Sequence, residues 1–297
     1  MKNIIVILLA LIVAIPYVYS QETTGLRIKL ESLLATEKGD FAIAFKDLQK
    51  PERNIFINEH ENFHAASTMK IPVMLEIFKQ VKEGKYKLSD SLLVKNEFKS
   101  IVDGSTYSMD ISRDSGEQLY EQIGSYRSIE DLVGDMIIYS SNLATNIVIE
   151  LVGADNVNST LRGMGAKNIK VLRGVEDIKA FDAGLSNTTT AYDLMLILEA
   201  IARGEAVNTI SSKRMVNILL KQKHRDMIPA LLPEHVKIAN KTGWINGVHH
   251  DSAIVYLPGG RKYVLVILSK NLENMDTATN MLSRASLLIY NYMESQE

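Results

Sequence analysis

The sequence predicts an α/β protein of the α+β type, in which both ends of the chain build one antiparallel sheet with flanking helices around an inserted all-helical domain. Residues 67–203 have mostly helical apolar spacing. Runs with period-two alternation lie on either side of this stretch, at 41–48, 54–60, 235–243, 251–258 and 263–270. Strands at both ends of a chain with helices between them favour a sheet domain from which a helical domain extends.

Composition is consistent with this class of fold. The 297 residues are 46% hydrophobic and 23% charged, which is typical of one or two packed globular domains. The net charge is −2 and the basic residues are interspersed with carboxylates, so we expect no nucleic-acid partner. Because the chain contains no cysteine, its stability has to come from core burial without disulfides.

The first segment, 1–20, has the pattern of a secretory signal peptide. Lys2 supplies a positive start, an unbroken apolar run extends from Ile4 to Ile15, and small residues favour cleavage before Gln21. The run is shorter than the roughly 20 residues that span a bilayer. We therefore expect an exported protein, periplasmic or secreted, with no stable membrane span after cleavage. An uncleaved membrane anchor is the alternative.

In chain order, the pattern predicts a helix over 26–34, the hairpin of 41–48 and 54–60, and then the helical middle. Within that middle, 171–190 contains two glycines, several Asp and Asn residues and no clear period. This composition predicts a long structured loop, and loops of that length are usually functional.

The last two strands are joined through Gly259-Gly260, a strong signal for a tight turn, and a helix over about 275–293 closes the chain. The sheet domain is thus predicted to contain 21–62 and 211–297, and the helical domain 63–210. A binding site would lie in the groove between the two domains.

Ser67 and Lys70 stand at the start of a predicted helix, where their spacing places both side chains on one face, one turn apart. A serine needs an adjacent base to become a nucleophile, and a desolvated lysine can serve as that base. The amino terminus of a helix also offers free N–H groups to an oxyanion. The alternative is an ordinary serine cap beside a lysine that reaches solvent.

Two other segments combine polar residues with apolar surroundings. Ser140 and Asn142 lie in the middle of helical sequence, where an asparagine side chain competes with the backbone for hydrogen bonds. Lys241, Thr242 and Gly243 end a predicted strand, where a glycine allows close approach to the backbone. Taken separately, a solvated helix face and an ordinary hairpin explain these segments. Their order along the chain is far more specific.

This order, Ser-x-x-Lys, Ser-x-Asn and Lys-Thr-Gly, resembles that of class A β-lactamases and penicillin-binding proteins, the serine penicillin-recognising enzymes. The resemblance covers essentially the whole mature chain and implies a β-lactamase/transpeptidase-like fold. It also implies that Ser67 is the acylated nucleophile, that Lys70 takes part in proton transfer and that Ser140 protonates the departing ring nitrogen.

For substrate binding, the resemblance implies that Asn142, Lys241 and Thr242 hold the amide and carboxylate of the substrate. Gly243 belongs to the same binding strand. The backbone N–H groups of Trp244 and of the nucleophile would form the oxyanion hole. The ring of Trp244, the only tryptophan, could line the site or simply pack in the core.

Glu176, in the predicted loop, matches the glutamate that activates the deacylating water in class A β-lactamases. The alternative is a loop carboxylate paired with a neighbouring cation, Arg173 or Lys179. The sequence departs from the family pattern at two positions: the asparagine expected four residues after the glutamate is Ala180, and the aspartate of Ser-Asp-Asn is Ser141. Both departures concern the deacylation step.

We therefore expect a monomeric serine hydrolase that opens β-lactam rings through an acyl-serine intermediate, without a metal or organic cofactor. Its partner would be a small-molecule β-lactam or a cell-wall peptide. The alternatives are a D-Ala-D-Ala peptidase or penicillin-binding protein, and a penicillin sensor that is acylated without turnover. His249, His250 and Asp251 could suggest a metal site or a triad, but the chain lacks the matching motifs, and we expect structural roles for them.

Overall fold

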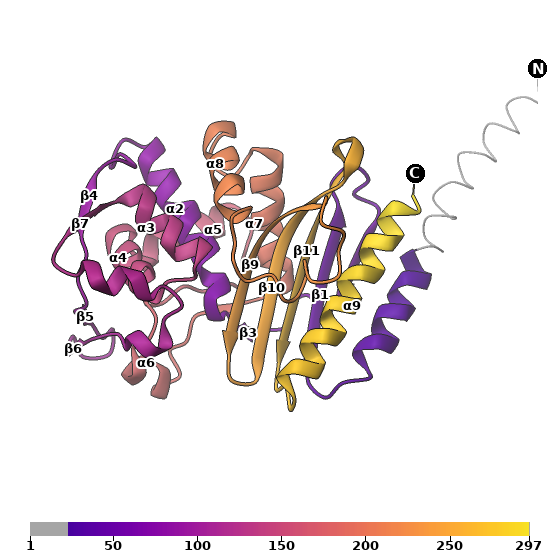
Figure 1. The fold of residues 1–297 in the computed structure, drawn as a ribbon, viewed down its shortest axis with the longest axis horizontal. Coiled ribbons are helices and arrows are strands. Elements are labelled where there is room, and N and C mark those ends of the chain that lie inside the picture. The colour runs from indigo at the N-terminus through magenta and orange to yellow at the C-terminus, as the bar shows by residue number, and fades with distance from the viewer. Residues whose placement is uncertain (1–22, 297) are drawn as a thin grey trace, which may run out of the picture.

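The computed structural model describes residues 23–296, so the predicted signal peptide lies outside the described residues. Its centre is a five-stranded antiparallel sheet with the strand order β2-β1-β11-β10-β9 (Figure 1). The strands are β1 (Asp40–Asp47), β2 (Asn54–Ile57), β9 (Lys237–Ile245), β10 (Val248–Tyr256) and β11 (Lys262–Lys270). Because β1 pairs with β11, the two ends of the chain meet in one sheet, and the predicted fold class is confirmed.

Alternation along the strands gives the sheet two apolar faces. In β1, Ile43 and Phe45 face one hydrophobic core while Ala42 and Ala44 face another. The helical residues 23–34 and α9 (Met275–Glu294) cover the first face, as Figure 1 shows. On the other face, α7 (Ala191–Arg203) and α8 (Thr209–Leu219) pack between the sheet and the insertion.

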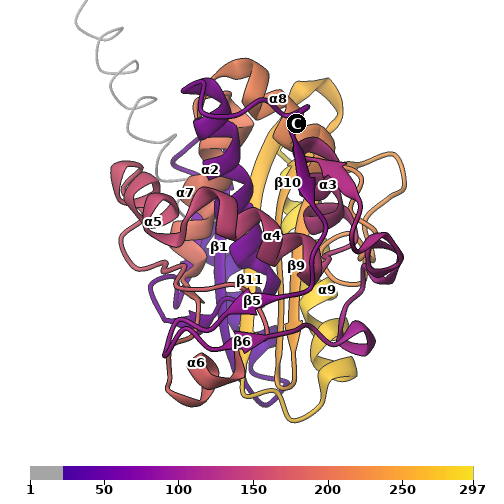
Figure 2. The same ribbon diagram turned by 90° about the vertical axis from the view of Figure 1, so that its left-hand side faces the viewer.

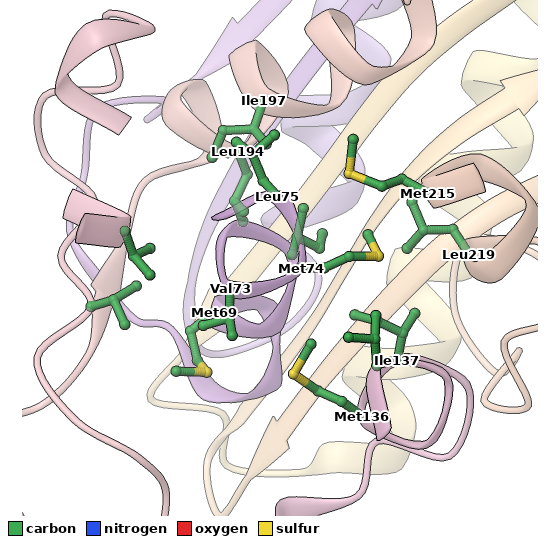
Figure 3. Close-up of a cluster of buried hydrophobic side chains, with 14 of the residues drawn as sticks. Met69, Val73, Met74, Leu75, Met136, Ile137, Leu194, Ile197, Met215 and Leu219 are labelled. Atoms are coloured by element: carbon green, nitrogen blue, oxygen red, sulfur yellow. The ribbon is translucent and has the colours of Figure 1, made fainter. Parts of the chain in front are cut away.

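The insertion packs its helices around α2, which lies at its centre (Figure 2). Its main helices are α2 (Lys70–Lys82), α3 (Ile129–Ile138), α4 (Asn142–Val152) and α5 (Ala154–Gly163). Figure 3 shows apolar side chains from the start of α2, from α3, from α7 and from α8 converging on one core. This core anchors the amino terminus of α2, the segment that carries Ser67 and Lys70.

The insertion is not all-helical, which corrects one part of the prediction. The chain between α2 and α3 forms short ladders and 3-10 turns in place of helices, because its turn-forming Asp, Ser and Gly residues sustain no helical period. These elements are β4 (Ser91–Leu93), β5 (Phe98–Lys99), β6 (Thr106–Tyr107), η2 (Ile111–Arg113), η3 (Glu117–Gln122) and β7 (Tyr126–Ser128).

The predicted loop over 171–190 is largely irregular, with a short helix α6 (Ile178–Asp182) and a short strand β8 (Thr188–Thr189) that pairs with β3 (Phe63–His64). Helix α7, placed in the helical domain by the prediction, packs on β1, β10 and β11. The domain boundaries therefore stay a prediction. Among residues 23–296, no helix combines the length and the apolar character that crossing a membrane requires.

Candidate active site

A cavity of about 710 Å³ lies between the edge strand β9 and the insertion. Its wall brings together distant parts of the chain, among them the turn before α2, the segment before α4, the 171–190 loop and the end of β9. Six residues singled out in the sequence line it, namely Ser67, Ser140, Asn142, Glu176, Thr242 and Trp244. Lys70 and Lys241 are fully buried beside it. The groove predicted between sheet and insertion is thus present.

Ser67 lies in the 3-10 turn η1 (Ala66–Met69), which leads directly into α2. No side chain caps either helix, so the interpretation of Ser67 as a helix cap is wrong. Ala66 has a φ of 43°, a left-handed conformation that is costly for a residue with a side chain. The Ala66 N–H donates to His64 Nδ1 at 3.0 Å and helps to hold this turn.

Lys70 reaches the loop before α4 instead of solvent. Its Nζ donates to the Ser140 carbonyl oxygen at 2.7 Å, to Ser140 Oγ at 3.2 Å and to Asn142 Oδ1 at 2.9 Å. Burial lowers the pKa of Lys70 to about 7, although the charges of Asp114 and Glu176 act in the opposite direction. A neutral amine is therefore available near pH 7, as a general base requires.

Ser140 and Asn142 are not in the middle of a helix, which corrects the prediction. Helix α3 ends at Ile138, and α4 begins at Asn142 with the Ser141 hydroxyl accepting from the Ala144 N–H at 3.2 Å. Ser140 stands in the break with a φ of 60°. A serine pair followed by an apolar run is a cap signal that could have placed this break from the sequence.

The Ser140 hydroxyl connects the two buried lysines. Its Oγ accepts from Lys70 Nζ at 3.2 Å and from Lys241 Nζ at 2.9 Å. Burial lowers the pKa of Lys241 well below its usual value, the charge of Lys70 lowers it further, and Asp251 opposes both effects. Two interacting amines joined through one hydroxyl form a route along which a proton can move.

Gly243 allows β9 to lie directly against the turn that carries Ser67. A Cβ at this position would stand 3.0 Å from the Ser67 nitrogen and 3.1 Å from the Thr68 nitrogen. Any larger residue would press the strand away from Ser67. The close approach expected at this glycine is therefore present.

Glu176 faces Asn142 and not the cations beside it in the sequence. Its Oε1 accepts from Asn142 Nδ2 at 3.2 Å, and its Oε2 accepts from the Asp110 N–H at 3.1 Å. Lys179 pairs with Asp103 at 2.7 Å instead. The alternative of a loop carboxylate held by Arg173 or Lys179 is therefore wrong. Glu176 lines the cavity, and its backbone has a φ of 61°.

The loop that carries Glu176 is fixed by buried polar groups. Asn146 of α4 pairs with Val175, accepting from its N–H at 2.6 Å and donating to its carbonyl oxygen at 3.0 Å. Asp177 accepts from the Ser100 hydroxyl and the Ile101 N–H, both at 2.9 Å. Ala180 is fully buried and brings no polar group to the cavity.

Asp114 is a site-building residue that the sequence analysis missed. It is buried and accepts from the N–H groups of Asn142 and Leu143, each at 2.8 Å, and from the Tyr120 hydroxyl at 3.1 Å. It thereby fixes the first turn of α4 and adds a negative charge that acts on Lys70. Its contacts with α4 join residues 28 and 29 positions apart, so no local pattern marks its place at the site.

Trp244 is 62% exposed and lines the cavity, so it is not a core side chain. His249, His250 and Asp251 are buried in β10, which agrees with structural roles. His249 also touches the cavity wall, together with His224 and Asp226, which the sequence analysis did not single out. Within residues 23–296, no group of three or more His, Cys, Asp or Glu residues could hold a metal ion.

Comparison with solved structures identifies the same architecture elsewhere. PBP-A is 25% identical, with a TM-score of 0.80 over 92% of this chain and 97% of that chain. A β-lactamase from Sphaerobacter thermophilus is 24% identical, with a TM-score of 0.78 over 89% of this chain and 96% of that chain. A β-lactamase from Xanthomonas campestris is 21% identical, with a TM-score of 0.80 over 92% and 98%. The last two likenesses concern the fold alone.

No curated protein matches the sequence significantly. The model of the β-lactamase enzyme family, Beta-lactamase2, matches residues 25–293, which is nearly the whole described chain. This family match agrees with the fold and with the three sequence motifs around Ser67, Ser140 and Lys241. The chain therefore belongs to the β-lactamase enzyme family.

Proposed function

We propose that the protein is a class A-like serine β-lactamase that opens the β-lactam ring through an acyl-enzyme on Ser67. The observation that carries the proposal is the buried pair Lys70 and Lys241 bridged by the Ser140 hydroxyl, beside a serine at the amino terminus of a helix. Further support comes from a variant of PBP-A, 25% identical to this chain, whose solved structure is an acyl-enzyme complex with penicillin G.

In the proposed acylation step, Ser67 Oγ attacks the carbonyl carbon of the lactam and its proton passes to the neutral amine of Lys70. The oxyanion accepts hydrogen bonds from the backbone N–H groups of Ser67 and Trp244. When the C–N bond breaks, the ring nitrogen takes a proton from Ser140, which regains one from the buried lysines. The product is an ester on Ser67.

Thr242 and Lys241 would receive the carboxylate of the substrate. Thr242 lies on the cavity wall, so its hydroxyl can donate to an anion. Asn142, which accepts from Lys70 and donates to Glu176, would hold the amide of the substrate and orient both catalytic groups.

In the proposed deacylation step, Glu176 removes a proton from a water that attacks the ester carbon, and Ser67 Oγ leaves as the alcohol. Glu176 is suitably placed because it accepts from Asn142, which also contacts Lys70. The protein would act after export from the cytoplasm, as a monomer without a metal or organic cofactor.

A second candidate function is a penicillin-binding protein or D-Ala-D-Ala peptidase. The observation that favours it is Ala180, which offers the deacylating water no side-chain partner. Such a protein would form the same ester on Ser67 and release it slowly with penicillins. Steady hydrolysis of a chromogenic cephalosporin supports the first function, whereas a single stoichiometric burst supports the second.

The first test is Ser67→Ala. This change removes the nucleophile and leaves the buried lysines in place, so we expect hydrolysis to fall by at least a thousandfold with no covalent adduct. Initial rates with a chromogenic cephalosporin and the intact mass of the protein measure both effects. Ser32→Ala, on the helix that covers the far face of the sheet, is the matched control. Wild-type turnover by Ser67→Ala would contradict the proposal.

A further inference from the structure

A second cavity, of about 660 Å³, lies outside the active site. It is lined by the end of α7, by α8, by the start of β9, by the end of β10 and by the start of β11. Of the described residues, none lines both this cavity and the active-site cavity. Its volume is typical of a site for a small molecule, and the proposed reaction gives it no task.

Part of the wall of this second cavity is apolar. Val216 and Leu220 stand one turn apart at the end of α8, and Tyr256 is the last residue of β10. All three pack against the hydrophobic core and yet stay partly exposed. Ile201 and Leu257, which also line the cavity, are buried. Apolar surface that remains open to water in a concave site favours a ligand that covers it.

The charged residues of the same wall are all basic. They are Arg203, Lys213, Lys237 and Lys262, and none of the described lining residues is an Asp or a Glu. The chain as a whole has a net charge of −2, so this cavity is a local excess of positive charge on a slightly acidic protein. Such an excess attracts anions.

Two of these cations are already paired within the protein. Arg203 Nε donates to Glu199 Oε1 at 2.9 Å, and Lys262 Nζ donates to a backbone carbonyl oxygen of α7. Lys213 on α8 and Lys237 at the start of β9 are exposed, and no described residue of the cavity wall offers them a negative charge. An anion bound in the cavity would supply that charge.

Two hydroxyl groups of the wall can serve as hydrogen-bond donors. Ser212 on α8 is 1% exposed, and among residues 23–296 its Oγ has no hydrogen-bond partner. Buried hydroxyls are normally paired, so a ligand oxygen would satisfy an unmet requirement. Burial raises the pKa of Tyr256 to about 12, so its hydroxyl stays protonated at neutral pH. Hydroxyl donors together with cations suit a carboxylate group.

We propose that this second cavity binds a small amphipathic carboxylate, that is, an apolar chain or ring that ends in one carboxylate group. The apolar part would cover Val216, Leu220 and the ring of Tyr256. The carboxylate would lie near the amines of Lys213 and Lys237. This binding does not depend on the proposed acyl-enzyme chemistry, because the two cavities share no described lining residue.

Decanoate is a suitable probe, since it joins a long apolar chain to one carboxylate. Isothermal titration calorimetry of the wild-type protein, below the micelle concentration of the probe, should show one decanoate bound per chain. Butyrate has the same head and a short chain, and we expect it to bind at least about tenfold more weakly. Decyltrimethylammonium has the same long chain and a positive head, and we expect a loss of at least about tenfold for it as well.

Two double variants test which residues hold the carboxylate. In Lys213→Gln/Lys237→Gln we expect the Kd for decanoate to rise about tenfold, because both unpaired charges are removed. The matched control is Lys167→Gln/Lys170→Gln, which removes two exposed charges outside the cavity wall and should change the Kd by less than about twofold. Thr242→Ala, which alters the wall of the active-site cavity, should also keep the wild-type Kd.

The contrary outcomes are equally distinct. Absence of decanoate binding to the wild type at millimolar concentration overturns the proposal, and so does equal binding of decyltrimethylammonium. Wild-type affinity in Lys213→Gln/Lys237→Gln, or an equal loss in both double variants, overturns it too. A loss confined to Thr242→Ala would place the anion in the active-site cavity and have the same consequence. All of these titrations omit β-lactams, so their result is separate from the test of the proposed function.

Discussion

At the scale of single residues, the proposed mechanism requires a neutral Lys70 amine to activate Ser67. Burial lowers the pKa of Lys70 to about 7, so the amine is neutral above that pH and protonated below it. We expect the acylation rate to level off above about pH 7 and to fall tenfold per pH unit below it. Single-turnover kinetics between about pH 5 and 9 measure this step apart from deacylation.

The variant Glu176→Gln provides an internal control for the pH dependence of acylation. The charge of Glu176 raises the pKa of Lys70, so removing it should move the acid limb of acylation to lower pH. If the acylation rate instead fell with a midpoint near pH 4 in both the wild type and Glu176→Gln, the base would be a carboxylate. That result would contradict the proposed role of Lys70.

A second prediction at the scale of single residues concerns the buried carboxylate of Asp114. Asp114→Ala leaves the N–H groups of Asn142 and Leu143 without their buried acceptor. We expect unfolding free energy to fall by about 2–4 kcal/mol, and kcat/KM to fall because Asn142 is no longer held. Urea unfolding and steady-state kinetics measure the two effects. Asp155→Ala, an exposed acid in the first turn of α5, should change both far less.

At the scale of elements, the contact between β9 and η1 positions Ser67, the proposed nucleophile. Gly243→Ala places a methyl group 3.0 Å from the Ser67 nitrogen, which presses the strand and the turn apart. We expect kcat/KM to fall by about a hundredfold, since small misplacement of reacting groups has effects of that size. Because the backbone conformation suits alanine, the melting temperature should change little.

Gly163→Ala is the control for that change. Gly163 lies in α5, and nothing stands within 4 Å of where its Cβ would be. It should keep wild-type activity. Full activity in Gly243→Ala would show that the contact between β9 and η1 has no part in catalysis.

At the scale of the whole molecule, the sequence predicted those parts of the fold that local patterns determine. The strands and the closing helix lie close to where alternation and helical spacing placed them, as with β11 (Lys262–Lys270) for 263–270 and α9 (Met275–Glu294) for about 275–293. The meeting of both chain ends in one sheet followed from the order of the elements.

The incorrect predictions lie in the stretch between α2 and α3 and at the break before α4. The stretch between α2 and α3 has no sustained period, and its short ladders pair within the stretch itself, β4 with β7 and β5 with β6. The break at Ser140 divides one apolar run into two helices because Ser141 caps α4 while Asp114 accepts from its first N–H groups.

The candidate site was predictable to the extent that motifs mark it. Ser67, Lys70 and Lys241 could be singled out because their spacing and order along the chain are specific. Asp114 could not, because its position at the site depends on how distant segments pack. Supporting residues with long-range partners leave no local trace in a single sequence.

In the proposed function, an ester forms on Ser67 and Glu176 drives its hydrolysis. The most direct measurement is the intact mass of Glu176→Gln after exposure to penicillin G, followed by peptide mapping. We expect the mass to increase by one penicillin, with the adduct on Ser67 and persisting while the wild type returns to its free mass. No adduct on Ser67, with turnover unchanged, would contradict the account.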